Sequence, residues 1–303
     1  MLCDYQDVLQ IEAGPQPFAD INNTYALIER SASQWPQAPA LSFFLRVEDH
    51  ARPVRWTYAQ LLADITRAAN LFERLGVRRG DVVALILPNL PQTHIAMWGA
   101  QTAGIAFAVN VLLDGTQMAE LLAAAKVRWI VTVGPEPDAQ IWQRVEGAIA
   151  RLPGLQGVLA VDPMRHLPGH GQSAPLPAEV AGVPVLDFFA ELALEPGERL
   201  RFAPPGLNDV AAYYCTGGTT GLPKIARHSQ RNEVIFCGQL DAVIGAPVLR
   251  PGRTVLTALP LFHVNALIGC GLAAFAQGGH VLLAPPAGFR TPGFMPRFWE
   301  IVE

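Results

Sequence analysis

Hydrophobic positions in the first half of the chain recur with two different periods, and the two alternate. Segments in which apolar residues return every three or four positions are separated by short apolar runs typical of buried strands. We predict helices over about residues 23–34, 58–75, 91–103, 116–125 and 138–150. We predict strands over residues 41–47, 82–87, 105–109, 128–133 and 157–161. This alternation predicts an α/β fold with mostly parallel sheets and flanking helices.

Local signals refine this pattern and divide the chain. Thr57 and Gln60 can form a capping box at the start of the second helix. Residues 163–206 are dense in proline and glycine, which predicts a connector that holds one short helix at Asp187 to Ala193. A second α/β block follows, with a helix that Ser229 can cap. Its predicted strands cover residues 210–215, 254–259 and 280–284. We therefore predict a first subdomain over residues 1–162 and a second over residues 207–303.

The last residues, PGFMPRFWEIVE, predict an amphipathic helix that reaches the end of the sequence without a cap. We therefore expect the sequence to be the front part of a longer protein. Charged residues make up only 16% of the chain, below the roughly 25% typical of soluble domains. A surface that the remainder would cover explains this shortfall. A helix that docks at a natural C-terminus is the alternative.

Charge and composition exclude several classes of function. The net charge of -4 gives no basis for a nucleic-acid partner. The acidic N-terminus does not resemble a secretory signal, and the longest apolar run, Val264 to Ala276, is shorter than the roughly 20 residues of a membrane span. The four scattered cysteines indicate neither disulfides nor a zinc site, and His166 and His170 flank a Pro-Gly break. We predict a cytoplasmic protein without a transmembrane segment or a metal site in this chain; the sequence leaves a homodimer open.

A stretch of small residues, CTGGTTGLPK, follows the predicted strand that ends at Cys215. Glycines let successive backbone N–H groups point into one concavity, which binds anions. Threonine hydroxyls add donors, and a lysine adds a mobile positive charge that reaches phosphate oxygens. The stretch therefore predicts a polyphosphate-binding loop formed by Thr216, Gly217, Gly218, Thr219, Thr220, Gly221 and Lys224.

Two common nucleotide motifs do not fit this loop. Gly217 and Gly221 enclose three residues where the P-loop has four, and Ile225 stands after the lysine where the P-loop has a hydroxyl. A G-x-G-x-x-G dinucleotide motif is missing too. A flexible turn is the remaining alternative, but a turn has no need for three threonines and a lysine together.

The loop resembles the phosphate-binding loop of the acyl-adenylate-forming (AMP-binding) enzymes, whose usual text is T-S-G-T-T-G-x-P-K-G. Three further stretches resemble blocks of that family in the right order: RWTYAQL with GVRRGDVVALILPN, then AGIAFAVNVLL, then LPLFHVNAL. Together they cover nearly the whole chain. Gly217 replaces the usual serine and Ile225 the usual glycine. The chain ends before the family's Tyr-Gly-x-Thr-Glu block, its ribose-binding aspartate and its C-terminal lysine.

The resemblance implies an acyl-CoA synthetase. Such an enzyme uses ATP to activate a carboxylic acid, here with a fatty acid preferred, as acyl-AMP, and then transfers the acyl group to coenzyme A. It implies that the loop holds the phosphates, that His263 lines the acyl and nucleotide pocket, and that the ligand of a Mg²⁺ ion lies beyond this chain. We assign no catalytic residue within the chain. His228 either supports the loop or is structural, and Cys215 has no evident basic partner.

Two other functions stay open. The acceptor can be the thiol of a carrier protein, as in adenylation domains, or the chain can be a nucleotide-binding fragment without catalysis of its own. We expect no measurable adenylate formation by residues 1–303 alone, because the late lysine and the metal-linked glutamate stabilise the transition state in this family.

Overall fold

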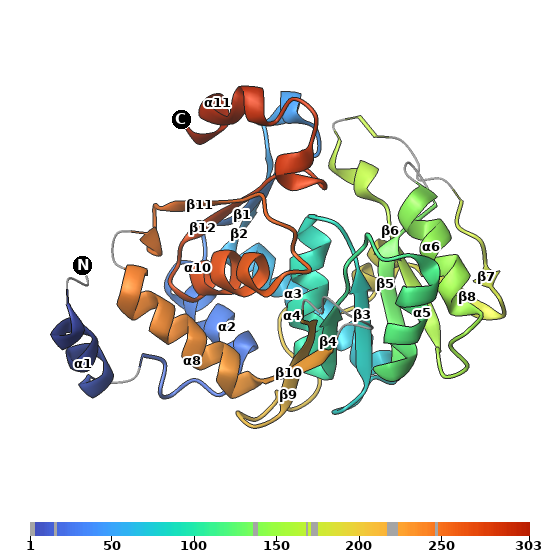
Figure 1. The fold of residues 1–303 in the computed structure, drawn as a ribbon, viewed down its shortest axis with the longest axis horizontal. Helices are drawn as coiled ribbons and strands as arrows, with labels where there is room; N and C mark the ends of the chain where they lie inside the picture. The colour runs from blue at the N-terminus through green and yellow to red at the C-terminus, as the bar shows by residue number, and fades with distance from the viewer. Residues whose placement is uncertain are drawn as a thin grey trace.

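Two β-sheets organise the computed structural model, which describes residues 4–14, 17–135, 139–167, 169–170, 175–216, 224–245 and 248–303. The larger sheet has eight strands in the order β10-β9-β4-β3-β5-β6-β8-β7 (Figure 1). Its parallel strands are β3 (Val82–Ile86), β4 (Ile105–Ala108), β5 (Val127–Val133), β6 (Gly157–Val161), β8 (Val183–Asp187) and β9 (Val210–Cys215). Its edges are the antiparallel strands β7 (Glu179–Val180) and β10 (Ile225–Ser229). The predicted α/β fold is confirmed.

Helices cover both faces of the larger sheet. Val83 and Leu85 of β3 belong to one core, and the alternate residues Val82, Ala84 and Ile86 to another. The first core is completed by α2 (Thr24–Gln34), α3 (Tyr58–Arg74) and α4 (Pro91–Ala103), the second by α5 (Gly115–Ala124) and α6 (Ala139–Ile149) (Figure 1). Both faces of the strands are thus shielded from water, which explains their continuous apolar sequences.

The smaller sheet has four strands and joins the two ends of the chain. Its order is β11-β12-β1-β2, formed by β11 (Thr254–Thr257), β12 (His280–Leu283), β1 (Pro39–Phe43) and β2 (Val54–Thr57). Leu41 pairs with Val281 in a parallel register. In the larger sheet β9 likewise pairs with the much earlier β4. Each sheet therefore takes strands from both sides of residues 163–206. The subdomain boundaries at residues 162 and 207 remain a prediction. The two sheets do not divide the chain at these boundaries.

Local capping signals are confirmed. Thr57 and Gln60 form both halves of a capping box: the Gln60 amide donates to Thr57 Oγ1 at 3.3 Å and the Thr57 amide to Gln60 Oε1 at 2.9 Å. Ser229 caps α8 (Gln230–Leu240) in the same way. Within the predicted connector, Asp187 caps the expected short helix α7 (Phe188–Ala193). The connector also supplies β7 and β8, which its proline-rich text did not predict.

The apolar segment predicted as one buried helix differs from expectation. Residues Asn265–Leu272 form a π-helix, η4, and only α10 (Ala273–Ala276) is α-helical. A π-helix is wider than an α-helix and is frequent at functional sites. Gly271 lies close to the His94 ring, because a Cβ at Gly271 would sit 2.7 Å from His94 Cε1. This close approach places the π-helix directly against α4.

The remaining helical elements are short. They are α1 (Tyr5–Ala13), η1 (Val47–Asp49), η2 (Pro163–His166), the π-helix η3 (Asp241–Gly245), η5 (Gly288–Arg290), η6 (Met295–Arg297) and α11 (Phe298–Val302), the last three of which end the described chain. In α11, Ile301 is buried while Trp299 is 73% exposed, so the predicted amphipathic C-terminal helix is confirmed. Within the described part of the chain, no helix has the length and apolar character needed to cross a membrane.

Candidate functional site

The two ends of the predicted phosphate loop meet at the top of the β9–β10 hairpin. The backbone amide of Thr216 donates to the carbonyl of Lys224 at 2.9 Å, and the Thr216 hydroxyl donates to the same oxygen at 3.3 Å. The structure therefore brings the first and last predicted binding residues together. The others, Gly217, Gly218, Thr219, Thr220 and Gly221, lie outside the described residues.

The direction of β9 determines where this loop emerges. Because β9 is parallel to β4, with Ala106 opposite Ala212, its last residue Cys215 lies at the edge of the sheet where β3, β4, β5 and β6 also end. Ligands of α/β folds bind at this carboxyl edge of the strands. The two described ends of the predicted loop thus lie where the fold favours a ligand.

A cavity of about 520 Å³ opens at the same edge. Segments that follow β1, β3, β4, β5, β6 and β12 line it, so both sheets contribute walls. The lining is mainly apolar but includes Arg46, Arg144 and Arg290, and none of the described lining residues is acidic. Arg144 is held by a 2.7 Å hydrogen bond from Nη1 to the carbonyl of Val111. Such a lining suits an organic anion that carries an apolar group.

Asn89 connects the two halves of this site. Its side chain is only 2% exposed. Asn89 Nδ2 donates to the carbonyl of Leu259 at 3.0 Å, Oδ1 accepts from the amide of Leu261 at 2.9 Å, and the backbone amide donates to the carbonyl of Pro286 at 3.2 Å. Asn89 follows β3, so it ties the larger sheet to the segments that follow β11 and β12. Sequence reasoning assigned it no role; its only signal was a buried-strand sequence that ends in a polar residue.

His263 lies just beyond the segment that Asn89 holds. β11 ends at Thr257, and a turn closed by the His263 amide, which donates to the Pro260 carbonyl at 3.0 Å, separates the two. His263 is exposed, and its Nδ1 accepts from the Asn265 amide at 3.4 Å. His263 thus stands between β11 and the π-helix η4. Its role in lining a pocket remains a prediction.

Cys215 precedes the predicted phosphate loop and His228 follows it, and the structure shows the surroundings of both side chains. Burial raises the pKa of Cys215 to about 11, so its thiol stays protonated near neutral pH and is a poor nucleophile. Burial also raises the pKa of Cys237 and Cys270, and all three described cysteines are free. His228 packs against Tyr214, with ring centroids 4.7 Å apart. The Cys215 thiol is therefore not activated, and His228 packs within the hairpin.

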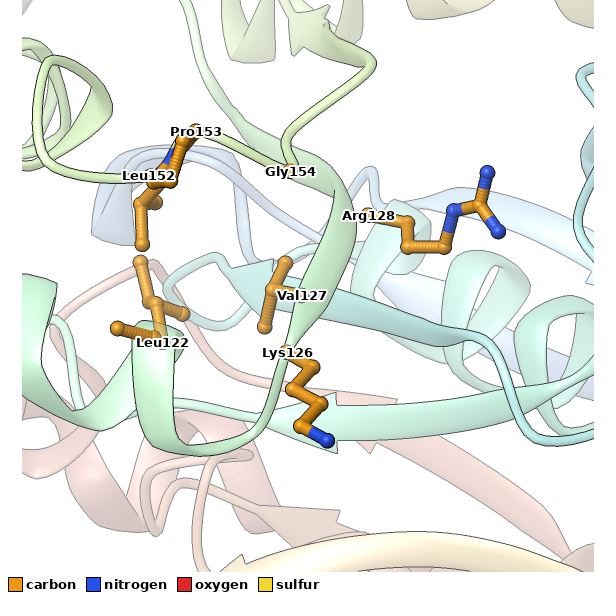
Figure 2. A pocket seen from close by; sticks show the side chains of 8 residues that line it. Leu122, Lys126, Val127, Arg128, Leu152, Pro153 and Gly154 are labelled. Carbon is orange, nitrogen blue, oxygen red and sulfur yellow. The ribbon is translucent and has the colours of Figure 1, made fainter.

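A second hollow, of about 510 Å³, lies at the opposite edge of the larger sheet, where β5 begins. Leu122 and Leu152 face each other across it, and the side chains of Lys126 and Arg128 extend away from it (Figure 2). Arg128 is already paired with Asp81, with Nη1 and Oδ1 3.0 Å apart. The candidate site therefore remains at the carboxyl edge, where the ends of the predicted phosphate loop lie.

Comparisons with known proteins identify the family of the chain. A family model described as AMP-binding enzyme matches residues 28–303. Marinolic acid–CoA ligase from Pseudoalteromonas sp. is 31% identical over 283 residues, which cover 90% of this chain and 40% of that protein. Long-chain-fatty-acid–CoA ligase from Escherichia coli O157:H7 is 32% identical over 235 residues, or 72% of this chain and 40% of that protein. The chain therefore spans less than half the length of these relatives.

Solved structures show the same fold. Acetoacetyl-CoA synthetase from Streptomyces lividans superimposes with a TM-score of 0.74 at 21% identity, over 93% of this chain and 41% of that one. The anthranilate CoA ligase AuaEII, solved with anthranoyl-AMP, gives a TM-score of 0.70 at 20% identity, over 91% of this chain and 46% of that one. With the family model matching residues 28–303, the resemblance predicted from the loop is confirmed: the chain belongs to the AMP-binding enzyme family.

Proposed function

We propose that this chain is the nucleotide-binding N-terminal part of an acyl-CoA synthetase that activates a carboxylic acid with ATP and passes it to coenzyme A. One observation carries the proposal. Thr216 and Lys224, the hydrogen-bonded ends of the predicted phosphate loop, lie at the carboxyl edge of the larger sheet. The cavity that Arg46, Arg144 and Arg290 help to line opens at the same edge. A phosphate-binding group and a seat for an organic anion at one edge are what acid activation requires.

The chemistry asks the protein to hold two anions together. An oxygen of the carboxylate attacks the α-phosphorus of ATP, the bond to pyrophosphate breaks, and acyl-AMP forms; a thiol then attacks the acyl carbon and AMP leaves. Negative charge grows on the departing pyrophosphate. Loop amides, the threonine hydroxyls and the ammonium group of Lys224 would stabilise that charge without reorganising. His263 would border the acyl side.

Magnesium is expected to accompany the nucleotide. Among the described residues, no three histidine, cysteine, aspartate or glutamate side chains gather into a group able to hold a metal ion. Mg²⁺ commonly binds through substrate phosphates and water with only one or two carboxylates. Such binding does not need a group of three protein ligands, and no step of the proposal depends on the ion.

The more specific part of the proposal is that the carboxylic acid is a fatty acid. The mainly apolar lining of the cavity supports an aliphatic substrate. The relatives include ligases named for long-chain fatty acids, marinolic acid and sulfoacetate, so membership of the family does not select the acid. A carrier-protein thiol in place of coenzyme A, and a fragment that binds nucleotide without turnover, remain the alternatives.

Two measurements on residues 1–303 test the proposal. Calorimetric titration should show that the chain binds ATP, and a non-hydrolysable acyl-adenylate mimic more tightly. Pyrophosphate exchange with palmitate should stay at background, since catalytic groups of the family lie outside this chain. A chain that binds neither ligand would overturn the proposal, and exchange above background would overturn the expected inactivity.

A further inference from the structure

A buried carboxylate lies behind the β9–β10 hairpin. Glu233 of α8 is fully buried. Its Oε2 accepts a 2.9 Å hydrogen bond from Gln101 Nε2, near the C-terminal end of α4. An ionisable side chain is almost never fully buried unless it has partners. The contacts of its second oxygen, Oε1, therefore indicate which residues Glu233 supports.

That second oxygen faces both strands of the hairpin. Oε1 accepts from the Tyr214 hydroxyl at 3.4 Å and lies 3.6 Å from His228 Nδ1. Tyr214 belongs to β9 and precedes the loop, whereas His228 belongs to β10 and follows it. Burial, followed by the charge of Glu233, raises the pKa of Tyr214, so its hydroxyl keeps the proton that it donates. One carboxylate oxygen thus contacts both stems of the predicted phosphate loop.

The other side of the carboxylate is fixed to a rigid frame. Gln101 accepts at Oε1 from the Thr24 hydroxyl at 2.8 Å, and its carbonyl accepts from Gln230 Nε2 at 3.0 Å. Gln230 Oε1 in turn accepts from the Thr24 amide at 3.0 Å. These bonds join α2, α4 and α8. Glu233 therefore links the hairpin to a frame of three helices that does not depend on the loop.

Stability alone does not explain a carboxylate at this position. Its desolvation is costly, and only one of its three contacts is short. An apolar residue of similar size is often as stabilising as a buried charge. We propose that Glu233 is a positioning residue of the nucleotide site, which holds Tyr214 and His228, and with them both ends of the phosphate loop, in place before phosphate binds. That the ligand is a nucleotide phosphate rests on the proposed function. Loop ends that are already held in place leave less ordering to accompany phosphate binding, which raises affinity.

Hydrogen exchange tests the anchoring without any ligand. We compare residues 1–303 with Glu233→Gln and Glu233→Leu. Both variants should exchange the amides of β9 and β10 faster, including that of Thr216, while β3 and β5 exchange as in the unchanged protein. Unchanged exchange in the hairpin would overturn the inference, whatever the protein binds.

Phosphate affinity gives the second test, with ATP and inorganic pyrophosphate as calorimetric probes. Glu233→Gln should weaken both by about tenfold, or about 1.4 kcal/mol. Glu233→Leu should do the same even where its melting temperature rises, a result that a purely structural role would not give. Tyr214→Phe combined with Glu233→Gln should weaken binding by less than the sum of the single effects, because both act through one contact.

Asn232→Ala is the matched control. It removes one half of the capping box of the same helix, the acceptor of the Ser229 amide, and should lower stability only modestly, but leaves Glu233 in place, so affinity should stay near that of the unchanged protein. Unchanged affinity in both Glu233 variants would overturn the positioning role. An unchanged protein that binds neither probe would overturn the proposed function and the phosphate part of this inference, while hydrogen exchange would still decide the anchoring.

Discussion

Asn89 Oδ1 accepts a 2.9 Å hydrogen bond from the backbone amide of Leu261. This bond joins the end of β3 in the larger sheet to the segment that leads from β11 to His263. The same side chain donates to Leu259, so both of its polar atoms are used on this short segment. A single buried amide group therefore ties the segment after β3 to the segment after β11.

Replacement of Asn89 by alanine should weaken both the fold and the site. Two buried hydrogen bonds disappear and leave backbone groups unpaired, so the free energy of unfolding should fall by roughly 2–4 kcal/mol, measured by urea denaturation. Asn70→Ala is the control, since Asn70 is equally buried and binds Pro196, Arg199 and Arg201 far from the cavity. Only the Asn89 variant should also lose affinity for an acyl-adenylate mimic; equal losses would contradict the assignment.

Lys224→Ala should lower ATP affinity by roughly 10- to 100-fold, the range for a lost charged hydrogen bond. Lys224 is exposed, so the melting temperature should hardly change. The chain contains one other lysine, the exposed Lys126, which extends into solvent at the far edge of the sheet (Figure 2). Lys126→Ala should leave calorimetric ATP affinity unchanged. Equal affinities for the two variants would remove Lys224 from the phosphate site.

His263→Ala should separate acyl binding from nucleotide binding. The side chain is exposed, and surface substitutions usually change stability by less than about 0.5 kcal/mol. If His263 borders the acyl group, the variant should bind an acyl-adenylate mimic several-fold more weakly while AMP affinity stays the same. Competition titrations with the two ligands measure this ratio, and a parallel loss for both would place His263 beside the nucleotide instead.

Stability should fall in mild acid because of buried histidines. Burial lowers the pKa of His94 from 6.5 to about 3. Below pH 6.5 the unfolded chain therefore binds a proton that the folded protein excludes, and the free energy of unfolding falls by up to about 1.4 kcal/mol per pH unit for this group. Burial also lowers the pKa of His166 to about 4, which adds a second contribution in the same direction.

His94→Leu should remove the first contribution. Among the described residues, neither ring nitrogen of His94 has a hydrogen-bond partner, and the ring packs against Trp98 and Phe275. Leucine should therefore stabilise the protein at neutral pH as well as flatten the slope, because no buried polar group is left unpaired. Urea unfolding between pH 7.5 and 5 measures both effects; an unchanged slope would contradict the assignment.

Sequence predicted the elements that carry their own signals. The helix expected over residues 91–103 matches α4, because Pro91 stands in its first turn and Gly104 follows its last residue. β2 and β10 were not predicted, since sequences such as VRWT and IARHS mix polar and apolar residues. Pairing with a neighbouring strand, rather than composition, makes those segments strands. The wide helix of η4 was missed for a similar reason, since an apolar sequence does not distinguish π from α geometry.

The candidate site was predictable only in part. Composition alone predicted the phosphate loop, because glycine, threonine and lysine together suit phosphate, and its role stays a prediction. Asn89 and Glu233 were not identified, since a single polar residue has no period and their partners are remote: Leu261 lies 172 positions from Asn89, and Gln101 lies 132 from Glu233. Such contacts become visible only when the fold brings distant segments together.

The parallel pair of Leu41 and Val281 has a consequence for biosynthesis. A ribosome adds roughly 5–20 residues per second, so β1 emerges about ten seconds or more before β12 exists to pair with it. During that interval the nascent polypeptide exposes an aggregation-prone strand edge. We therefore expect the yield of folded protein to depend on how long this edge stays unpaired during translation.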